Sequence, residues 1–487
     1  MRSRSRSAMV VGAVFLLALV LPSAFLPSRS APAPEPIAAP RTNAAAEQLA
    51  GLASCSGRAC HGAIEPVGGG IQQNEFVSWL NFDKHAQAFD VLKGERARRM
   101  AKNLGIASAE KDARCLACHT TPQLAGSVPE HLAELRGDGV SCEACHGPAK
   151  GPDPWLAAHT LTTWKKSDDK ARTEAYHARG MTPLFDLSVQ AQTCAGCHVG
   201  APADPEHGIP ARDLNHDLMA AGHPRLTFEL ATFRANMPPH WRIDKHKDVP
   251  GYEGAVWAIG QVATAKAAVE LLAHRATEAA AEKAPWPEFA EASCFACHAD
   301  LRNPSWRRKA EYYSGRRPGA IPMNRWPIEM LPALESIAAG KVAPADKALQ
   351  ALAAEMNKAY PDPAKVQALT RTSDADLASL LATVKSANFD AGALKKLSEA
   401  IAKQMEASKE PDWDTTTQTA LAAAALRDAI GRERLTNSQR QLDEVFRDLA
   451  YPKWYESPAT YSPHVKGEAD AEDVHALLIK ILQEMSH

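Results

Sequence analysis

Apolar positions follow three successive patterns along the chain. Residues 8–21 form a stretch without charged residues directly after a basic start that contains Arg2, Arg4 and Arg6. Between about residues 47 and 325, short apolar segments are separated by loops that contain proline and glycine. From about residue 326 onward, alanine and leucine recur at helical spacing. The pattern therefore predicts an N-terminal segment, a loop-rich region and a helical region.

Within the loop-rich region, the spacing predicts one helical stretch over residues 76–92 and a longer helix from Ala255 to about Lys283. The longer helix has an apolar stripe formed by Val256, Ile259, Val262, Ala265, Val269 and Leu272. Core packing is the simpler role for this stripe. Covering the face of a large cofactor is the alternative.

The helical region is expected to contain five or six helices over residues 345–358, 374–385, 391–406, 415–430, 437–449 and 471–485. Ser373 and Thr436 precede two of these segments and are the residue types that cap helix N-termini. The predicted fold class is therefore mainly α, with an all-α C-terminal domain over residues 326–487 that follows a region with little regular structure.

The N-terminal segment has the basic start and apolar stretch of a secretory signal. If the apolar stretch continues through Pro22 to Leu26, it is just long enough to span a bilayer. We therefore expect either a cleaved signal peptide or an N-terminal membrane anchor within residues 1–30. A stiff linker rich in proline and alanine follows at 31–46. The expected location is the periplasm, free or tethered to the membrane.

Charge and composition exclude some functions. The net charge of −2 gives no basis for a chain-wide nucleic-acid surface, so no nucleic-acid partner is expected. A hydrophobic fraction of 45% argues against a mostly disordered chain. All 10 cysteines lie between Cys55 and Cys297, so whatever chemistry they carry belongs to the loop-rich region.

Four cysteine pairs have the spacing C-x-x-C-H, which is the signature of covalent haem c attachment. Each thiol forms a thioether with one vinyl group of the porphyrin, and the histidine that follows supplies the proximal nitrogen to the iron. The four sets are Cys115, Cys118 and His119; Cys142, Cys145 and His146; Cys194, Cys197 and His198; and Cys294, Cys297 and His298.

The fifth pair, Cys55 and Cys60 followed by His61, has four intervening residues. Gly57 would allow this longer loop to fold tightly, so we expect a fifth haem here, and a disulfide is the alternative. Zinc sites also use C-x-x-C pairs, but they do not require a histidine after every second cysteine. A disulfide framework suits a small domain rather than a chain of this length. The expected cofactor is five covalently attached haem c groups within a domain over residues 47–325.

Residues 52–200 resemble the cytochrome c-554 family, which are tetrahaem c-type cytochromes described from ammonia oxidisers. The resemblance rests on order and local context, in Ser78-Trp79, residues 84–89, the motif at Cys115, the stretch 139–148 and the motif at Cys194. Two features depart from the family: the longer spacing of the first pair and the additional motif at Cys294. The resemblance implies that the haem on Cys115 and Cys118 lacks a distal protein ligand.

Five haems with two histidine ligands each would need five further histidines. His85 and His159 match positions where the family places a histidine. His216 and His223 are seven residues apart, which allows both to point the same way on a helix, and their segment resembles distal-ligand segments of larger multihaem cytochromes. His177 is the fifth candidate. The other histidines are expected to have ordinary surface or core roles, as at His131, His207, His240, His246 and His274.

Three functions are compatible with these patterns. The first is an electron carrier that connects other redox proteins through closely spaced haems. The second is an oxidoreductase that acts on a small nitrogen or sulfur compound at one five-coordinate haem. The third is a haem-bearing subunit that docks a redox enzyme through its C-terminal helices. The first is preferred, so an electron carrier is expected rather than a catalyst.

Overall fold

The computed structural model describes most of the chain after residue 44. The described residues are 45–67, 72–160, 169–241, 249–297, 320–338, 345–408, 413–431, 436–449 and 468–486. Residues 42–487 form one compact unit. The predicted signal or anchor at 1–30, and the linker at 31–46 apart from its last two residues, lie outside the described part.

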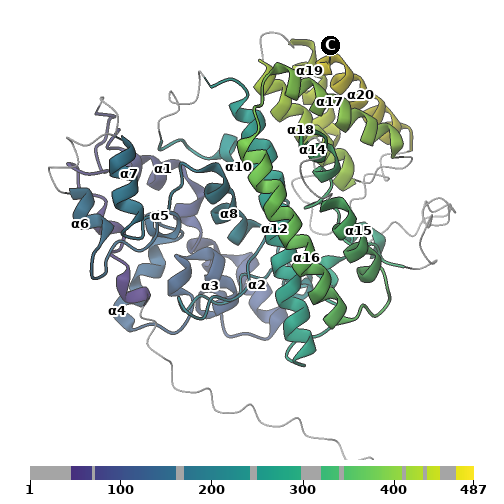
Figure 1. Cartoon of the computed structure of the whole chain (residues 1–487). Coiled ribbons are helices and arrows are strands. Elements are labelled where there is room, and N and C mark those ends of the chain that lie inside the picture. Colours follow the sequence, from purple (N-terminus) through teal and green to yellow (C-terminus); the bar gives the residue numbers. More distant parts are fainter. Residues whose placement is uncertain are drawn as a thin grey trace, which may run out of the picture. The chain divides into compact units, whose positions relative to one another are not determined.

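The first half of the compact unit is built from short helices joined by loops (Figure 1). Described residues here include isolated β-bridges, such as the one between Ala201 and Arg212, but no β-strand. The helices are α1 (Glu75–Phe82), α2 (Glu95–Leu104), α3 (Ala113–His119), α4 (Glu130–Ala133), α5 (Cys142–His146), α6 (Trp155–Thr160), α7 (Asp169–His177), α8 (Leu187–His198), α9 (His216–Ala221), α10 (Leu230–Asn236) and α13 (Cys294–Cys297).

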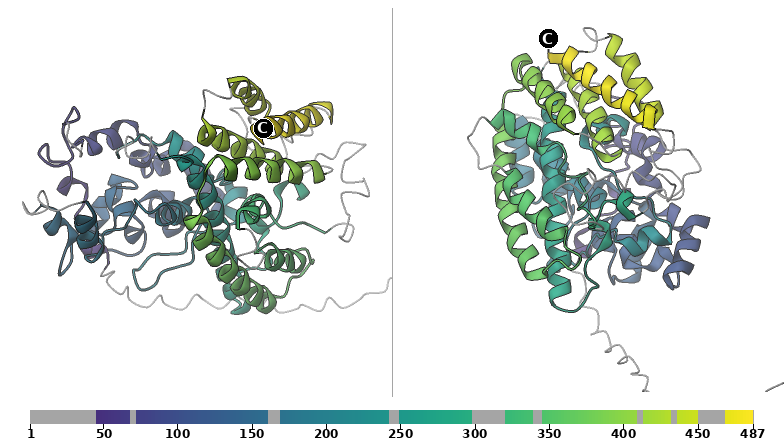
Figure 2. Two further views of the ribbon diagram at one scale, coloured as in Figure 1. Left: turned by 45° about the horizontal axis from the view of Figure 1, so that its top comes forward. Right: turned by 90° about the vertical axis from the view of Figure 1, so that its right-hand side faces the viewer.

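Longer helices make up the rest of the unit. The predicted long helix is present as α12 (Tyr252–Ala280), which packs along α16 and against α8, as the two views of Figure 2 also show for α12 and α16. The C-terminal helices are α14 (Leu331–Ala338), α15 (Ala345–Met356), α16 (Pro363–Ser386), α17 (Ala391–Ala407), α18 (Trp413–Ile430), α19 (Thr436–Leu449) and α20 (Glu468–Ser486). The prediction of a mainly α fold is confirmed.

One predicted N-cap is wrong. Ser373 is buried in the middle of α16, because that helix begins ten residues earlier at Pro363, where the Asp362 side chain accepts hydrogen bonds from the backbone N–H groups of Ala364 and Lys365. Proline is favourable at this first position, since its missing N–H would have no partner inside the helix. Thr436 is the first described residue of α19, so its role as a cap stays a prediction.

The single helical stretch predicted over residues 76–92 is broken in the structure. Helix α1 ends at Phe82, and two short 3-10 helices follow over Lys84–Gln87 and Asp90–Lys93. Asp83 causes the break, because its backbone is extended and its side chain accepts the N–H of His85 as a new cap.

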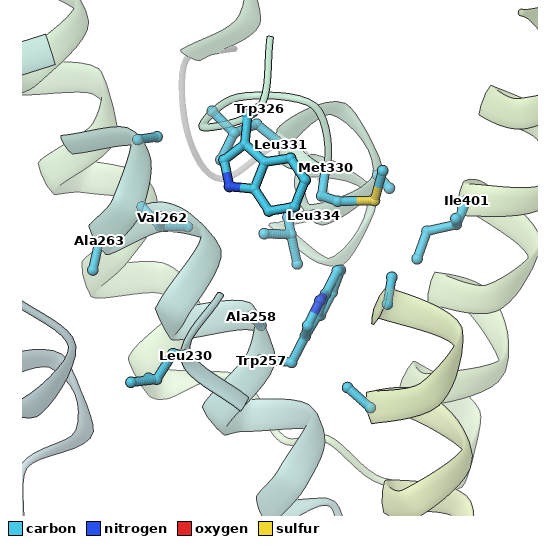
Figure 3. Packing of buried hydrophobic residues seen from close by; sticks show 14 of the residues in the cluster. Leu230, Trp257, Ala258, Val262, Ala263, Trp326, Met330, Leu331, Leu334 and Ile401 are labelled. Carbon is cyan, nitrogen blue, oxygen red and sulfur yellow. The ribbon is translucent and has the colours of Figure 1, made fainter. Parts of the chain in front are cut away.

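One hydrophobic core connects the two halves of the compact unit. It includes Ala191 of α8, Trp257 of α12 and Met485 of α20. Figure 3 shows Trp257 among core residues from later helices, including Leu334 of α14 and Ile401 of α17. Helices on both sides of residue 326 therefore share buried apolar surface. The predicted domain boundary at that residue stays a prediction.

Helix α12 is the one described helix that is long and apolar enough to cross a membrane by length and composition. In its most apolar window, 72% of the residues are buried inside the protein. Burial against α16, α8 and α10 accounts for this hydropathy. The sequence prediction that the apolar stripe packs in the core agrees with this arrangement.

Candidate haem-binding sites

The C-x-x-C-H motifs lie on short helices, so their ligands share one face. In an α-helix, residues at i, i+3 and i+4 are neighbours on the same side. Helices α3, α5 and α8 each end at the motif histidine, His119, His146 or His198. Both thiols and the imidazole of a motif can therefore approach the same flat cofactor. Helix α13 contains Cys294 and Cys297, whereas His298 lies outside the described residues.

The first pair reaches a similar arrangement through a tight loop. The N–H groups of Cys60 and Gly62 donate to the carbonyl of Gly57, at 2.8 and 3.0 Å, and the N–H of His61 donates to the carbonyl of Cys55 at 3.3 Å. These bonds fold the four intervening residues so that Cys60 and His61 return to Cys55. All ten cysteines are described and free, so none of them forms a disulfide.

Glu143, the residue after Cys142, joins the first motif to the third. Its buried carboxylate accepts hydrogen bonds from the backbone N–H groups of Ala50, Gly51 and Ala149, at 2.9, 2.8 and 2.8 Å. A charged acceptor with several N–H donors is held firmly. The segment that leads into Cys55 is thereby fixed on the helix that carries Cys142. The sequence analysis did not assign this role to Glu143.

Thiols from different motifs lie next to one another. The thiols of Cys55 and Cys142 are close enough to affect each other's pKa, which lowers the pKa of Cys55 and raises that of Cys142. The thiols of Cys118 and Cys197 affect each other in the same way, so that the pKa of Cys197 is lowered and that of Cys118 is raised. The first motif is therefore adjacent to the third, and the second to the fourth.

Cys145 connects these two groups of motifs. Burial raises the pKa of its thiol to about 12, and the nearby thiols of Cys194 and Cys197 contribute to this rise. The third motif is thus close to the fourth. Together with the two thiol pairs, this places four motifs in a continuous series: first, third, fourth and second.

Three pairs of histidine rings face each other at similar distances. The ring centroids are 5.9 Å apart for His61 and His159, 5.9 Å for His85 and His198, and 6.3 Å for His119 and His223. Two imidazole nitrogens bound to opposite sides of one metal ion, each at about 2 Å, leave their ring centroids about 6 Å apart. Each pair joins a motif histidine to one of the predicted distal histidines.

Several of these histidines are oriented through Nδ1. His61 Nδ1 lies 2.9 Å from Glu75 Oε2, and His85 Nδ1 lies 2.8 Å from Asp83 Oδ1. The hydrogen bond that His61 donates to the Glu75 carboxylate raises the pKa of His61. A metal-bound histidine usually donates its other ring N–H to a carboxylate or carbonyl, which fixes the tautomer and leaves Nε2 for the metal. The arrangement at both rings has this form.

His146 has a different neighbour from those the sequence suggested. Burial lowers the pKa of His146 to about 4, and the nearby His240 contributes a smaller part of this decrease. His240 was expected to have an ordinary role, so its proximity to a motif histidine was missed. It follows Pro238 and Pro239, and neither its spacing nor its local sequence distinguishes it.

His177 is the weakest of the predicted distal histidines in terms of contacts. Its Nδ1 lies 2.5 Å from the carbonyl oxygen of Met181, and its ring lies 5.2 Å from that of Phe185. Its Nε2 is buried without a hydrogen-bond partner. No motif histidine faces its ring at the distance seen in the three pairs, within the residues that the structure describes.

His216 lies beside the fifth motif. Its backbone N–H donates to Glu288 Oε1 at 2.9 Å, and its ring lies 5.8 Å from that of Phe289, just before Cys294. Glu291 and His198 line the same pocket, so this segment lies close to the fourth motif. The fifth motif is therefore near the fourth, and His216 is near the fifth.

An ion pair holds the C-terminal helices next to the fifth motif. Arg225 donates two hydrogen bonds to Asp414 of α18, at 2.7 and 2.9 Å. Asp414 is 1% exposed. The charges of both residues affect the pKa of Cys294, which burial raises. Helix α18 therefore contributes to the surroundings of this motif.

The donor geometry fits haem better than zinc. A structural zinc site gathers four protein ligands around one ion, yet in the described ranges no three or more histidine, cysteine, aspartate or glutamate side chains gather in that way. Haem iron takes four nitrogens from the porphyrin, so the protein supplies only two axial ligands. Facing histidine pairs next to paired cysteines match this requirement. The bound group would supply a one-electron Fe(III)/Fe(II) couple.

Comparison with known proteins agrees with this chemistry over part of the chain. Residues 54–147 match the family model described as cytochrome c554 and c-prime. The match contains the first three cysteine pairs and confirms the resemblance over this segment; the motifs at Cys194 and Cys294 lie beyond it. No curated protein and no solved structure matches the chain.

The match defines the class of protein. The chain is a c-type cytochrome that functions in electron transfer and carries covalently bound haem c. Its segment 54–147 is similar to the cytochrome c554 and c-prime family in particular.

Proposed function

We propose that this protein is an exported pentahaem c-type cytochrome that passes electrons between other redox proteins. The observation that carries the proposal is the continuous series of motifs, in which thiols of consecutive motifs are close enough to interact. Electron relay requires closely spaced redox groups. The proposed order along the relay is the first, third, fourth and second haem.

Axial histidine pairs support a carrier rather than a catalyst. The facing pairs are His61 with His159, and His85 with His198. An iron with two histidine ligands has no position for a substrate. We propose His240 as the partner of His146 because the two rings are close enough for His240 to affect the pKa of His146. His216 is proposed as the distal ligand of the fifth haem, whose proximal ligand is His298.

The N-terminal sequence supports export. The basic start and apolar stretch within residues 1–30 have the form of a signal or anchor. The proposed location is the periplasm, free or tethered to the membrane. The proposed partners are redox proteins that exchange electrons with the outermost haems.

Counting the haems tests the proposal directly. Pyridine haemochrome quantification combined with intact mass should give five haems per chain. The double variant Cys55→Ser/Cys60→Ser should give four, and Cys294→Ser/Cys297→Ser should also give four. If the wild-type protein carries four haems and Cys55→Ser/Cys60→Ser does not lower that number, then no haem is attached at Cys55 and Cys60. Protein without haem at any motif would overturn the function.

A second measurement separates carrier from enzyme. In a redox titration, each attached haem should take up one electron. The protein should also exchange electrons with small redox proteins. Sustained turnover of hydroxylamine, nitrite or sulfite at a rate that depends on one open iron would contradict the carrier function.

A further inference from the structure

We infer that His223 is the sixth ligand of the iron held at Cys115, Cys118 and His119, so that this haem is closed to small molecules. The inference rests on the proposed function, because it requires a haem at this motif. It departs from what the resemblance implies, since the matching haem of the cytochrome c-554 family lacks a distal protein ligand. It also removes the iron on which the oxidoreductase alternative depends.

The positions of the two rings carry the inference. The centroids of His119 and His223 are 6.3 Å apart. The pairs His61–His159 and His85–His198 have centroids 5.9 Å apart, and all three values are close to the separation of about 6 Å expected for two imidazoles on one metal. The space opposite His119 is therefore occupied by a ring that can bind the iron.

The hydrogen bonds of the two rings orient them in the same way. His119 Nδ1 lies 2.7 Å from the carbonyl oxygen of Ala88, and His223 Nδ1 lies 2.8 Å from that of Pro224. A carbonyl only accepts hydrogen bonds, so each Nδ1 carries the proton and each Nε2 keeps its lone pair. This tautomer is the one that a metal-binding histidine needs.

The backbone holds His223 in place. Helix α9 ends at Ala221, and Gly222 has a φ of 127°, a conformation that residues with a side chain rarely adopt. The turn is closed by the N–H of His223, which donates to the carbonyl of Leu218 at 3.0 Å. It is tied to α2 by Asn103, whose side-chain amide donates to the carbonyl of Ala221 at 3.1 Å. A ligand on a fixed turn is preorganised for binding.

The ring planes give this haem a spectroscopic signature. His119 and His223 are nearly perpendicular, at 82°, whereas His85 and His198 are at 73° and His61 and His159 are nearly parallel, at 14°. Each imidazole interacts with the iron d orbital that its own plane selects. Perpendicular rings therefore make two d orbitals nearly equal in energy, which gives a low-spin signal with a large maximum g value. Parallel rings split these orbitals and give an ordinary rhombic low-spin signal.

The test uses full-length, haem-loaded protein and His223→Ala. Wild-type protein should show low-spin iron at this motif and no carbon monoxide binding after reduction. The variant should gain a high-spin signal of about one haem per chain and bind about one carbon monoxide, with loss of a large-g signal. The matched control is His207→Ala, because His207 is exposed, its Nδ1 is held by Asp204 at 2.7 Å, and no other histidine among the described residues faces it. The control should leave spin state and ligand binding unchanged.

The outcomes separate this inference from the proposed function. Peptide mass spectrometry reports whether Cys115 and Cys118 carry haem. If they carry none, the proposed function fails at this site. If they carry haem and wild-type protein already binds carbon monoxide there, or if His223→Ala changes neither spin state nor carbon monoxide binding, only the inference about His223 fails. If His223→Ala does not accumulate, the wild-type measurements alone still decide the matter.

Discussion

The carboxylate of Asp83 orients His85 through two bonds. Asp83 Oδ1 lies 2.8 Å from His85 Nδ1 and accepts the backbone N–H of His85 at 2.9 Å. Burial acts to raise the pKa of Asp83, but the hydrogen bonds and charge of His85 bring it below its usual value. The same contact raises the pKa of His85. A charged carboxylate therefore lies behind the ring that faces His198, on the side opposite the proposed iron.

Replacing this carboxylate should change a reduction potential. A hydrogen bond from Nδ1 to a carboxylate makes a histidine ligand more basic, which favours Fe(III). The variant Asp83→Asn should therefore raise the potential of the haem at Cys194 and Cys197, and leave the haem count unchanged. A spectroelectrochemical titration measures this shift.

The chain offers a matched control for this potential. Asp204 forms the same kind of pair with His207, at 2.7 Å, but that histidine is exposed and faces no other histidine ring in the part of the chain that the structure describes. Asp204→Asn should leave every potential unchanged. Equal titration curves for Asp83→Asn and wild type would show that His85 is not an iron ligand.

The local part of each site could be predicted from sequence, because a covalent motif fixes its own geometry. Two cysteines and a histidine at i, i+3 and i+4 share a helix face in any fold. The distal histidines could be proposed but not paired. His85 meets His198, and His119 meets His223, only after loops and helices far apart in sequence pack together. His240 was missed for the same reason, since its position near His146 depends on tertiary structure alone.

Helix boundaries show a similar limit. Serine is a favourable cap, so Ser373 was a reasonable start for a helix. In the structure α16 begins at Pro363, and Ser373 is buried in the helix interior. The pattern over 76–92 suggested one helix, but the hydrogen bond from His85 to Asp83 made a break more favourable. Local side-chain bonds of this kind compete with helix continuation.

The ion pair between Arg225 and Asp414 should be important for stability. Both partners are largely removed from water, with side-chain exposures of 16% and 1%. Asp414→Asn leaves the Arg225 charge without its carboxylate, and breaking a buried pair in this way lowers the free energy of unfolding by about 3 kcal/mol. Denaturant unfolding followed by far-UV circular dichroism measures the loss.

An exposed pair provides the comparison. Lys93 and Asp90 are 2.9 Å apart with side-chain exposures of 54% and 67%. Surface pairs of this kind contribute about 0.5 kcal/mol, so Asp90→Asn should barely move the unfolding midpoint. Similar midpoints for Asp414→Asn and Asp90→Asn would contradict the structural role of the Arg225–Asp414 pair.

The N-cap of α8 should make stability depend on pH. Asp186 accepts the N–H and hydroxyl of Ser188 and lies 2.8 Å from Lys385 of α16. Burial acts to raise its pKa, but these partners lower it below the usual value. A carboxyl whose pKa is lower in the folded state stabilises the fold above its unfolded pKa of about 3.9. That stabilisation is lost as pH falls through the folded pKa.

The variant Asp186→Asn should therefore melt below wild type at pH 7, and the gap in melting temperature should narrow as pH falls below about 4. Lys385→Ala should show the same narrowing, because it removes the other half of the pair. Thermal unfolding from pH 7 to pH 3 measures both variants. A gap that is constant over this range would exclude the titration of Asp186 as its cause.

A side chain added at Gly260 in the core should disturb the surroundings of the fourth haem. A Cβ atom at Gly260 would lie 2.5 Å from the Cβ of Leu230, which is fully buried. Leu230 begins α10, and the neighbouring rings of Phe228 and Phe233 lie 5.7 and 4.8 Å from that of His198. Overpacking costs about 1–3 kcal/mol, and the better helix propensity of alanine offsets about 1 kcal/mol.

Gly260→Ala should therefore lower the free energy of unfolding by about 1 kcal/mol and shift the low-spin signal assigned to His85 and His198, because α10 must move. Denaturant unfolding and electron paramagnetic resonance measure the two effects. The control is Gly137→Ala, since nothing lies within 4 Å of the added Cβ there. If Gly260→Ala is as stable as wild type with an unchanged spectrum, the contact between α12 and α10 does not position the aromatic residues around His198.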